Sequence, residues 1–256
     1  MARVRIAGKK GSKAVKGIVD NTDVKRYIGK KYPTDILINY GLAGARLQQF
    51  FRKFPSAKSI PTLNAHIGHG KYSALQKVQK SGIIEVPESR LSLRHSDKTG
   101  DWIEKLVNSI GGKGICAARG KGRRNGRYYQ RMIKNRKFEI RVHAFTWMPE
   151  SDWRVQKRLG DHDTIAWNFS QGGHFATVSS PKRWNTYGKA LEVTPKILKL
   201  FGMSFGAVDF IVGEDYTVYF IEVNSAPGFT EVSQPTYAKA FSALCGMSTS
   251  DIRKHV

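Results

Sequence analysis

Three oxygen-bearing side chains near the C-terminal end, Asp209, Glu222 and Asn224, are spaced so that they can form one metal site. Asp209 lies in the first of two runs rich in β-branched and aromatic residues, and Glu222 and Asn224 lie in the second. Gly213–Tyr216 separates the runs, which predicts a β-hairpin. Because side chains alternate between the faces of a strand, a loop of these four residues places all three side chains on one face. An odd loop would place Asp209 and Glu222 on opposite faces.

Two carboxylates side by side on an apolar hairpin repel each other and resist the loss of water. A divalent cation removes both problems, because Mg²⁺ takes carboxylate and amide oxygens together with phosphate oxygens of a substrate. The pattern therefore indicates a Mg²⁺ site at Asp209, Glu222 and Asn224. A hairpin at a sheet edge, with its acids pointing into water, explains the same pattern.

The same hairpin register predicts one face of a core. With the four-residue loop, Asp209 pairs with Phe220, so Phe220 shares the face of the carboxylates. The opposite face carries apolar and aromatic side chains: Val208, Phe210, Val212, Tyr219, Ile221 and Val223.

A further half-buried strand is predicted at 137–145. Its apolar side chains alternate with Glu139, Arg141 and His143, so these three share a face. On a sheet that also carries the two acids, Arg141 would be a cation for phosphate oxygens. A single histidine such as His143 is more often a buried structural residue than a catalytic one.

A small α/β domain is predicted over residues 1–66. Its strand–helix–strand pattern consists of Asp35–Gly41, Ala45–Phe54 and Thr62–Asn64. The lysine-rich start of the chain is expected to be a mobile basic arm or to hold short strands, at Val4 and Ile6 and at Ile18 and Val19. Residues 67–256 are expected to form the second domain.

Besides a terminal helix at Tyr237–Leu244, two helices are predicted in that second domain. The first is Lys71–Ser81, ended by Gly82. The second has helical apolar spacing over 188–201 but contains Pro195, which is expected to be the first residue of a helix capped by Thr194.

A glycine-rich loop joins two predicted strands, Trp102–Val107 and Ile115–Ala118. Such a loop exposes backbone N–H groups on which an anion can dock, and Lys105 adds a charge for a phosphate. An ordinary glycine-rich hairpin accounts for the same pattern.

The net charge of +23 implies attraction to nucleic acid, acidic protein or phosphorylated small molecules. Its densest segment, Gly120–Arg127, predicts either a solvated loop or a flap that contacts a polyanion. The two cysteines offer no disulfide framework, and no apolar run has the length of a signal peptide or membrane span. A cytoplasmic protein without a membrane partner is expected.

Two motifs carry a resemblance to a known family. Glu222–Gly228 resembles the E-V-N-x-x-P-G signature of ATP-grasp enzymes, in the branch of glutathione synthetase and the ribosomal-protein-modifying glutamate ligases. Phe205–Asp209 resembles the G-x-D strand of that branch at the family's usual separation. The likeness covers about residues 71–234, where weaker pieces follow in the family's order; Arg158 is one of them.

The resemblance implies an α/β (α+β) ATP-grasp fold. Two α+β subdomains grip ATP, one of them a lid at about 90–135, and the small N-terminal domain precedes them. It also implies a set of nucleotide contacts: Lys71, Lys105, Gly111, Gly112, Gly114, Gln130, Arg131, Met132, Ile133 and Asn168. Arg131 stands where the family usually has an acidic residue. Arg141 corresponds to the catalytic arginine that faces the transferred phosphate, and Asp209, Glu222 and Asn224 to the ligands of two Mg²⁺ (or Mn²⁺) ions.

The implied activity is that of a carboxylate–amine ligase, in which ATP forms an acylphosphate and an amine then displaces phosphate. The substrates would be small-molecule or peptide carboxylates and amines, and the basic surface favours an acidic or phosphate-bearing one, or contact with nucleic acid. Two alternatives remain at this stage. One is a kinase with the ATP-grasp fold, and the other is a basic nucleic-acid-binding protein without catalysis.

Overall fold

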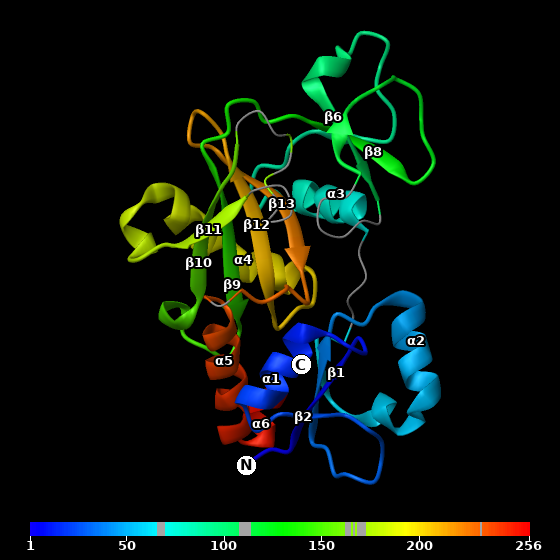
Figure 1. The fold of residues 1–256 in the computed structure, drawn as a ribbon, viewed down its shortest axis with the longest axis vertical. Helices are drawn as coiled ribbons and strands as arrows, with labels where there is room; N and C mark the ends of the chain where they lie inside the picture. The colour runs from blue at the N-terminus through cyan, green and yellow to red at the C-terminus, as the bar shows by residue number, and fades with distance from the viewer. Residues whose placement is uncertain (66–69, 108–113, 162–164, 166, 168–172, 231) are drawn as a thin grey trace.

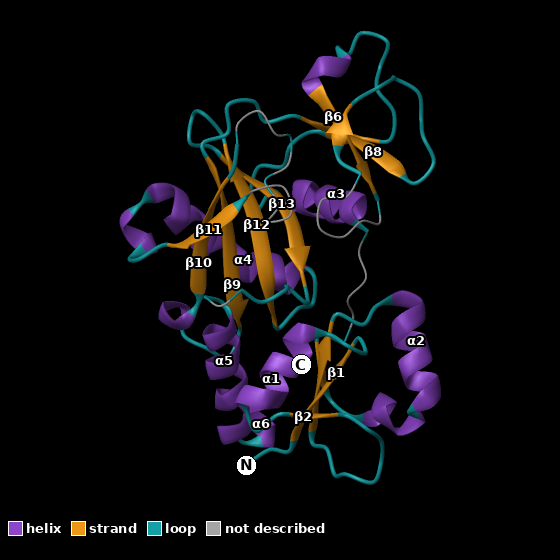
Figure 2. Cartoon of the chain, viewed as in Figure 1, coloured by secondary structure: helices purple, strands orange, loops and turns teal. Residues whose placement is uncertain are grey.

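The structure, a computed structural model, describes residues 1–256 except 66–69, 108–113, 162–164, 166, 168–172 and 231. Its described strands form three sheets: a four-stranded sheet from the N-terminal part, a five-stranded central sheet and a second four-stranded sheet. In Figure 1 the N-terminal sheet lies at the lower end of the molecule, and the other two sheets lie above it on either side of one helix. Figure 2 shows that most helices lie against a sheet face or at a sheet end.

The N-terminal sheet is parallel and is covered by helices on both faces. Its strand order is β2-β1-β3-β4, with β1 (Val4–Gly8), β2 (Lys25–Arg26), β3 (Ile36–Tyr40) and β4 (Thr62–Leu63). Helix α1 (Lys13–Asn21) packs with Ile36 and Ile38, and α2 (Gly44–Lys53) packs with Leu37. Because neighbouring residues of β3 point to opposite faces, every residue of this strand is buried.

The prediction of a strand at Ile18 and Val19 was wrong, because both residues lie in α1. Ser12 caps this helix by accepting the Val15 N–H at 3.3 Å, and Val15 and Ile18 point into the core. Two adjacent apolar residues such as Ile18 and Val19 are too few to distinguish the helical spacing of apolar residues from that of a strand.

The central sheet is antiparallel throughout, with order β11-β10-β9-β12-β13. Its strands are β9 (Phe138–Phe145), β10 (Arg154–Leu159), β11 (His174–Thr177), β12 (Phe205–Val212) and β13 (Val218–Asn224). Helices α3 (Lys71–Ser81) and α4 (Asn185–Leu200) share one large core with the apolar face of this sheet. The polar face, which carries Glu139 and Arg141 as expected, is left for the functional residues.

The hairpin of β12 and β13 reaches the expected face through a different register. Its loop is one residue longer than predicted, since Val212 pairs with Val218, and a β-bulge then shifts the register between Asp209 and Phe210. Asp209 therefore pairs directly with Glu222, and the predicted partner Phe220 pairs with Phe210 instead. The odd loop and the bulge cancel, so the two carboxylates still share a face.

The longer loop and the bulge also correct the predicted faces of the hairpin. Phe220 is fully buried in the core rather than beside the carboxylates. Ile221, the extra residue of the bulge, lines the functional cleft instead of the core. Tyr219 is half-buried and pairs with Ile211, which also lines the cleft, so it too leaves the predicted core face.

The predicted helix start at Pro195 was wrong, because Pro195 lies inside α4, which begins at Asn185. Proline cannot donate the backbone hydrogen bond of its position. Thr194 is buried within the helix, where its hydroxyl donates to the Ala190 carbonyl at 2.7 Å instead of capping a helix start. Burial of Val193, Ile197 and Leu198 against the central sheet stabilises the helix on both sides of the proline.

The third sheet is small and antiparallel, with order β5-β8-β6-β7. Its strands are β5 (Ser89–Arg90), β6 (Trp102–Leu106), β7 (Cys116–Ala117) and β8 (Arg127–Arg131). One face has its own core of Leu93, Trp102, Ala118 and Tyr129. The other face carries Ile103 and Lys105 toward the central sheet.

The C-terminal helices α5 (Gln234–Gly246) and α6 (Thr249–Arg253) join the N-terminal sheet to the central sheet. Tyr237 and Phe241 of α5 lie in one core with residues of β1, β3 and α1. The Tyr40 hydroxyl also donates to the Pro227 carbonyl at 2.7 Å. Gly41 has a φ of +77°, and a Cβ there would overlap Ala226.

Four short 3₁₀ turns complete the described secondary structure: Pro55–Ser59, Thr99–Asp101, Glu150–Asp152 and Pro181–Arg183. Among the described helices, none has the length and apolar character needed to cross a membrane.

His143 is buried between β9, β10 and α5 and has a partner for each ring nitrogen. Nε2 lies 2.9 Å from the Gln156 amide oxygen, and Nδ1 lies 3.1 Å from the Tyr237 hydroxyl. One neutral tautomer satisfies both contacts, with Nε2–H donating and Nδ1 accepting. Burial, with help from the charge of Arg141, lowers the pKa of His143 to about 4.

We therefore expect His143 to contribute to acid unfolding. The folded protein holds His143 neutral down to pH about 4, whereas the unfolded chain takes up a proton near pH 6.5. The stabilisation is complete above pH 6.5 and is lost as the pH falls toward 4, by about 3 kcal/mol. Urea unfolding of His143→Gln between these pH values should show a pH dependence smaller by that amount. His174→Gln, at an exposed edge-strand position, is the control, and an unchanged dependence in His143→Gln would contradict the assignment.

Candidate functional site

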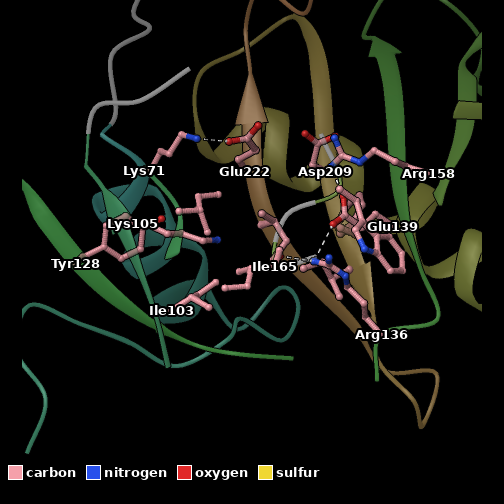
Figure 3. Close-up of a pocket in the computed structure, with 15 residues that line it drawn as sticks. Lys71, Ile103, Lys105, Tyr128, Arg136, Glu139, Arg158, Ile165, Asp209 and Glu222 are labelled. Atoms are coloured by element: carbon pink, nitrogen blue, oxygen red, sulfur yellow. Dashed lines mark hydrogen bonds and ion pairs between the residues drawn. The ribbon is translucent and has the colours of Figure 1, made fainter. Parts of the chain in front are cut away.

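A cleft lies between the polar face of the central sheet and the cleft-facing side of the third sheet (Figure 3). Lys71, Lys105, Arg136 and Arg158 bring positive charge to its lining. Apolar residues line the space between these charges: Ile103, Ile115, Ile165, Ile211 and Ile221, with Tyr128 and Trp167. The cleft thus combines an apolar surface with four cations and three carboxylates, Glu139, Asp209 and Glu222.

Asp209 lies on an inner strand of the sheet and is held by Arg141 from the neighbouring strand. The two residues are register partners on β12 and β9, and the guanidinium donates from Nε and Nη2 to the two carboxylate oxygens at 2.6 and 2.7 Å. Burial alone would raise the pKa of Asp209, but the charge and hydrogen bonds of Arg141 outweigh it and lower the pKa to about 2. Asp209 is therefore an anion at neutral pH in spite of its burial.

Glu222 lies directly opposite Asp209 in the sheet and contacts a different cation. Its Oε2 is 3.0 Å from the Nζ of Lys71, the first residue of α3, as Figure 3 shows. Both side chains remain about a quarter exposed, at 24% for Lys71 and 29% for Glu222. Directly paired residues have Cβ atoms roughly 5 Å apart, which is within the span of one cation between two carboxylates.

Asn224 is two residues further along β13, on the strand face of Glu222 by alternation. Its side-chain oxygen accepts the Ala226 N–H at 3.0 Å, which fixes the start of the loop after the strand. The carbonyl oxygen retains a second lone pair for a cation.

Lys105 reaches the cleft from β6 and is bound by the side-chain oxygen of Gln130 on β8. Gln130 in turn donates to the Ser89 hydroxyl at 3.4 Å. Burial, together with the nearby charge of Lys71, lowers the pKa of Lys105 to about 8. The lysine therefore stays mostly charged at neutral pH and is oriented by a neutral partner that does not cancel its charge.

Glu139 lies on the floor of the cleft between two arginines that the sequence reasoning did not connect to it. It forms ion pairs with Arg158 from β10 and with Arg136, the latter at 3.4 Å. Arg136 also lies 4.0 Å from the centre of the Trp167 ring. Burial raises the pKa of Glu139, against the opposing effect of both arginines. The spacing of three residues between Arg136 and Glu139 was visible in the sequence, but the contact with β10 required the sheet register.

The structure brings together only part of the predicted nucleotide set. Lys71 and Lys105 line the cleft with Asp209 and Glu222, and Gln130 contacts Lys105. Gly114 has a φ of +77°, and a Cβ there would come within 2.6 Å of Leu106. Gly111, Gly112 and Asn168 lie outside the described residues.

The remaining predicted contacts lie at the end of β8 and directly after it, and they do not line the cleft. Arg131 is exposed, lies 5.7 Å from the centre of the Trp102 ring and pairs with Asp101 at 3.5 Å. The Met132 N–H donates to the Asp101 carbonyl at 2.9 Å, and Ile133, half-buried, follows it. Arg141 also does not line the cleft, because its guanidinium is turned onto Asp209.

The donor set fits a metal held jointly with a substrate. In the described part of the chain, no three acidic, histidine or cysteine side chains gather as a metal site. The pair of Asp209 and Glu222 supplies two carboxylates, and Asn224 adds an amide oxygen. An ion there would need further oxygen ligands, which the phosphates of a nucleotide provide.

The family model for the D-ala D-ala ligase C-terminus matches residues 140–255, the segment that contains Arg141, Asp209 and Glu222. Comparison with curated proteins gives no match. The fold, in contrast, recurs in many solved structures.

Three solved structures illustrate the likeness. The macrocyclase MdnC from Microcystis aeruginosa MRC, bound with the precursor peptide MdnA, is 11% identical with a TM-score of 0.59, over 95% of this chain and 99% of that one. The ATP-grasp ligase PsnB, with minimal precursor, Mg and ADP, is 13% identical with a TM-score of 0.61, over 95% and 96%. N5-carboxyaminoimidazole ribonucleotide synthetase from Thermotoga maritima is 10% identical with a TM-score of 0.63, over 97% and 77%.

At these identities the solved structures establish the fold, and the predicted mixed α/β ATP-grasp fold is confirmed. The family match adds a sequence relation to a ligase domain. The chain therefore has the fold of ATP-grasp enzymes, and its residues 140–255 match a ligase domain, in agreement with the family that its motifs resemble.

The two carboxylates should differ in their effect on stability. Asp209→Asn leaves the guanidinium of Arg141 buried without its partner, so we expect the free energy of unfolding to fall by about 3–5 kcal/mol. Glu222→Gln breaks only the partly exposed pair with Lys71, which should cost about 1 kcal/mol or less. Urea unfolding without nucleotide or metal measures both. Equal losses of unfolding free energy in the two variants would show that the deeper burial of Asp209 does not make its ion pair more important for stability.

Proposed function

We propose that the chain is an ATP- and Mg²⁺-dependent ligase that joins a substrate carboxylate to an amine through an acylphosphate. The observation that supports this most is the direct pairing of Asp209 with Glu222 in a cleft that also presents Lys71 and Lys105. Phosphoryl transfer depends mainly on positioning and on neutralisation of charge, and this cleft offers both.

Asp209 and Glu222 would hold one Mg²⁺ and Glu222 with Asn224 a second, and the bound ions neutralise the charge that develops on the β- and γ-phosphates. Arg141 keeps Asp209 ionised and fixed in orientation. Lys71 exchanges the carboxylate of Glu222 for a phosphate oxygen when nucleotide is present, and Lys105 contacts the same phosphates. The isoleucines of the cleft and Tyr128 form the apolar surface for the adenine.

Two displacements complete the proposed reaction. A carboxylate oxygen attacks the γ-phosphorus, the bond to the bridging oxygen breaks, and ADP leaves with that electron pair. The amine nitrogen then attacks the acyl carbon, phosphate leaves with the electrons of the carbon–oxygen bond, and the nitrogen loses a proton. Arg136 and Arg158, fixed by Glu139, are the cations that face the oxygens of the acylphosphate from the floor of the cleft. The expected catalytic role of Arg141 in that contact stays a prediction.

The substrates are proposed to be peptides or small molecules with a carboxylate and an amine. MdnC and PsnB are described in complexes with precursor peptides, which supports a peptide on at least one side of the reaction. Closure of the cleft by the third sheet would keep water from the acylphosphate.

Removal of a proposed metal ligand should abolish turnover without unfolding the protein. Glu222→Gln and Asn224→Ala are expected to lower Mg-ATP-dependent release of ADP by about 100-fold or more. Glu192→Gln is the matched control, because Glu192 also binds lysine side chains but does so on the exposed side of α4. Full activity of either variant would remove the metal assignment.

Acceptor dependence separates the ligase from a kinase with the same fold. A ligase should release ADP in step with amide formation, and hydroxylamine should trap its acylphosphate as a hydroxamate. A kinase would release ADP without an amine and accumulate a stable phosphorylated product. Screening carboxylates and amines for stimulated ADP release therefore tests the reaction class. Thermal stabilisation by Mg-ATP distinguishes both from a binding protein without catalysis.

A further inference from the structure

The basic segment that the proposed reaction does not use lies on the far side of the third sheet from the cleft. Side chains alternate along β6, so Ile103 and Lys105 face the cleft while Trp102 and Glu104 face away. Residues 119–127 run over that second face and carry five cations and no acid: Arg119, Lys121, Arg123, Arg124 and Arg127.

One buried carboxylate fixes two of these cations. Glu104 is fully buried, and its oxygens accept from Nη1 of Arg124 at 2.8 and 2.9 Å and lie 2.8 Å from Nη1 of Arg127. The two arginine side chains are nevertheless 48% and 26% exposed. Each guanidinium has five donors, so both keep N–H groups free for a second anion.

The segment itself is fixed to the sheet by its backbone. The Leu93 N–H donates to the Lys121 carbonyl, the Tyr129 hydroxyl to the Gly122 carbonyl and the Val107 N–H to the Gly126 carbonyl, at 2.7 to 2.9 Å. The arginines are therefore presented from an ordered segment, which lowers the entropy lost when they bind.

These arginines surround a hollow. Arg119, Arg124 and Arg127 line a space of ≈ 190 Å³ together with Gly114, Ile115 and Cys116. Three guanidiniums beside one buried carboxylate leave two positive charges there. In the part of the chain that the structure describes, Arg119 has no ion-pair partner. Ile115 lines both this hollow and the cleft, so the hollow adjoins the apolar wall of the cleft.

We propose that this hollow binds a carboxylate side chain of an acidic peptide segment, and that the peptide is a substrate of the ligase. Only the statement that the peptide is a substrate rests on the proposed function. Guanidinium groups bind carboxylates in a two-pronged arrangement, and three of them converge here. The net charge of +23 attracts such a segment from solution, and the hollow selects where it binds.

A peptide fits the surface better than a nucleic acid does. Single-stranded nucleic acid binds through aromatic side chains on which its bases stack. The described residues from 114 to 127 contain no aromatic side chain, and the two that follow, Tyr128 and Tyr129, are buried. A hollow with room for one anionic group suits a carboxylate side chain rather than a continuous phosphate backbone.

Fluorescence anisotropy with a labelled peptide of alternating glutamate and glycine tests the proposal on the full-length protein. We expect Arg119→Gln to weaken binding about 5- to 10-fold at low salt. Arg123→Gln is the matched control, because it removes the same charge from the same segment but does not line the hollow. Its effect should be less than about 2-fold. Neither residue belongs to the proposed catalytic site, so the thermal shift with Mg-ATP should be unchanged in both.

Three results would overturn the proposal: equal weakening by the two variants, tighter binding of a labelled single-stranded oligonucleotide that Arg119→Gln abolishes, or no peptide binding by the wild type. The first would indicate diffuse attraction by the whole basic surface. A wild-type protein that binds the peptide but shows no thermal shift with Mg-ATP would count against the ligase function alone, so the two failures are distinguishable.

Discussion

The polar face of the central sheet depends on one ion pair, that of Asp209 and Arg141. A buried carboxylate on an inner strand of a five-stranded sheet keeps its charge only if a cation from the adjacent strand compensates for the lost water. The guanidinium does so with two hydrogen bonds, and its orientation is thereby fixed as well. The proposed metal ligand is thus part of the sheet's own stability, and the more exposed Glu222 is free to exchange partners.

The co-facial arrangement of the carboxylates followed from the sequence, although the register did not. Alternation of side chains, combined with an assumed four-residue loop, predicted a shared face for Asp209 and Glu222, although the loop is one residue longer. The five-residue separation of Val212 from Val218 and the bulge at Ile221 are decided by packing, because Phe220 is buried in the core beside Phe210. The loop is one residue longer than predicted and the bulge adds one residue to β13, so the two changes in register cancel. Side-chain alternation predicts such a site correctly only when changes in strand register occur in pairs or are absent.

Other features needed tertiary contacts that no local pattern contains. The helix around Ile18 forms because Val15 and Ile18 reach a core completed by α5, more than two hundred residues later. Pro195 is tolerated inside α4 because the sheet buries the residues around it. Glu139 connects Arg136 with Arg158 only after β9 and β10 are paired. In each case long-range burial outweighs a local preference, whereas the short motifs around Glu222 carry their own signal.

The loop that follows Asn224 is anchored from outside its own sheet. Tyr40 bonds to Pro227, and the backbone of Gly41 lies so close to Ala226 that only glycine fits there. The end of β3 therefore fixes the position of the loop that follows Asn224, the last proposed metal ligand. The position of the N-terminal sheet is thereby coupled to that of the loop directly after Asn224.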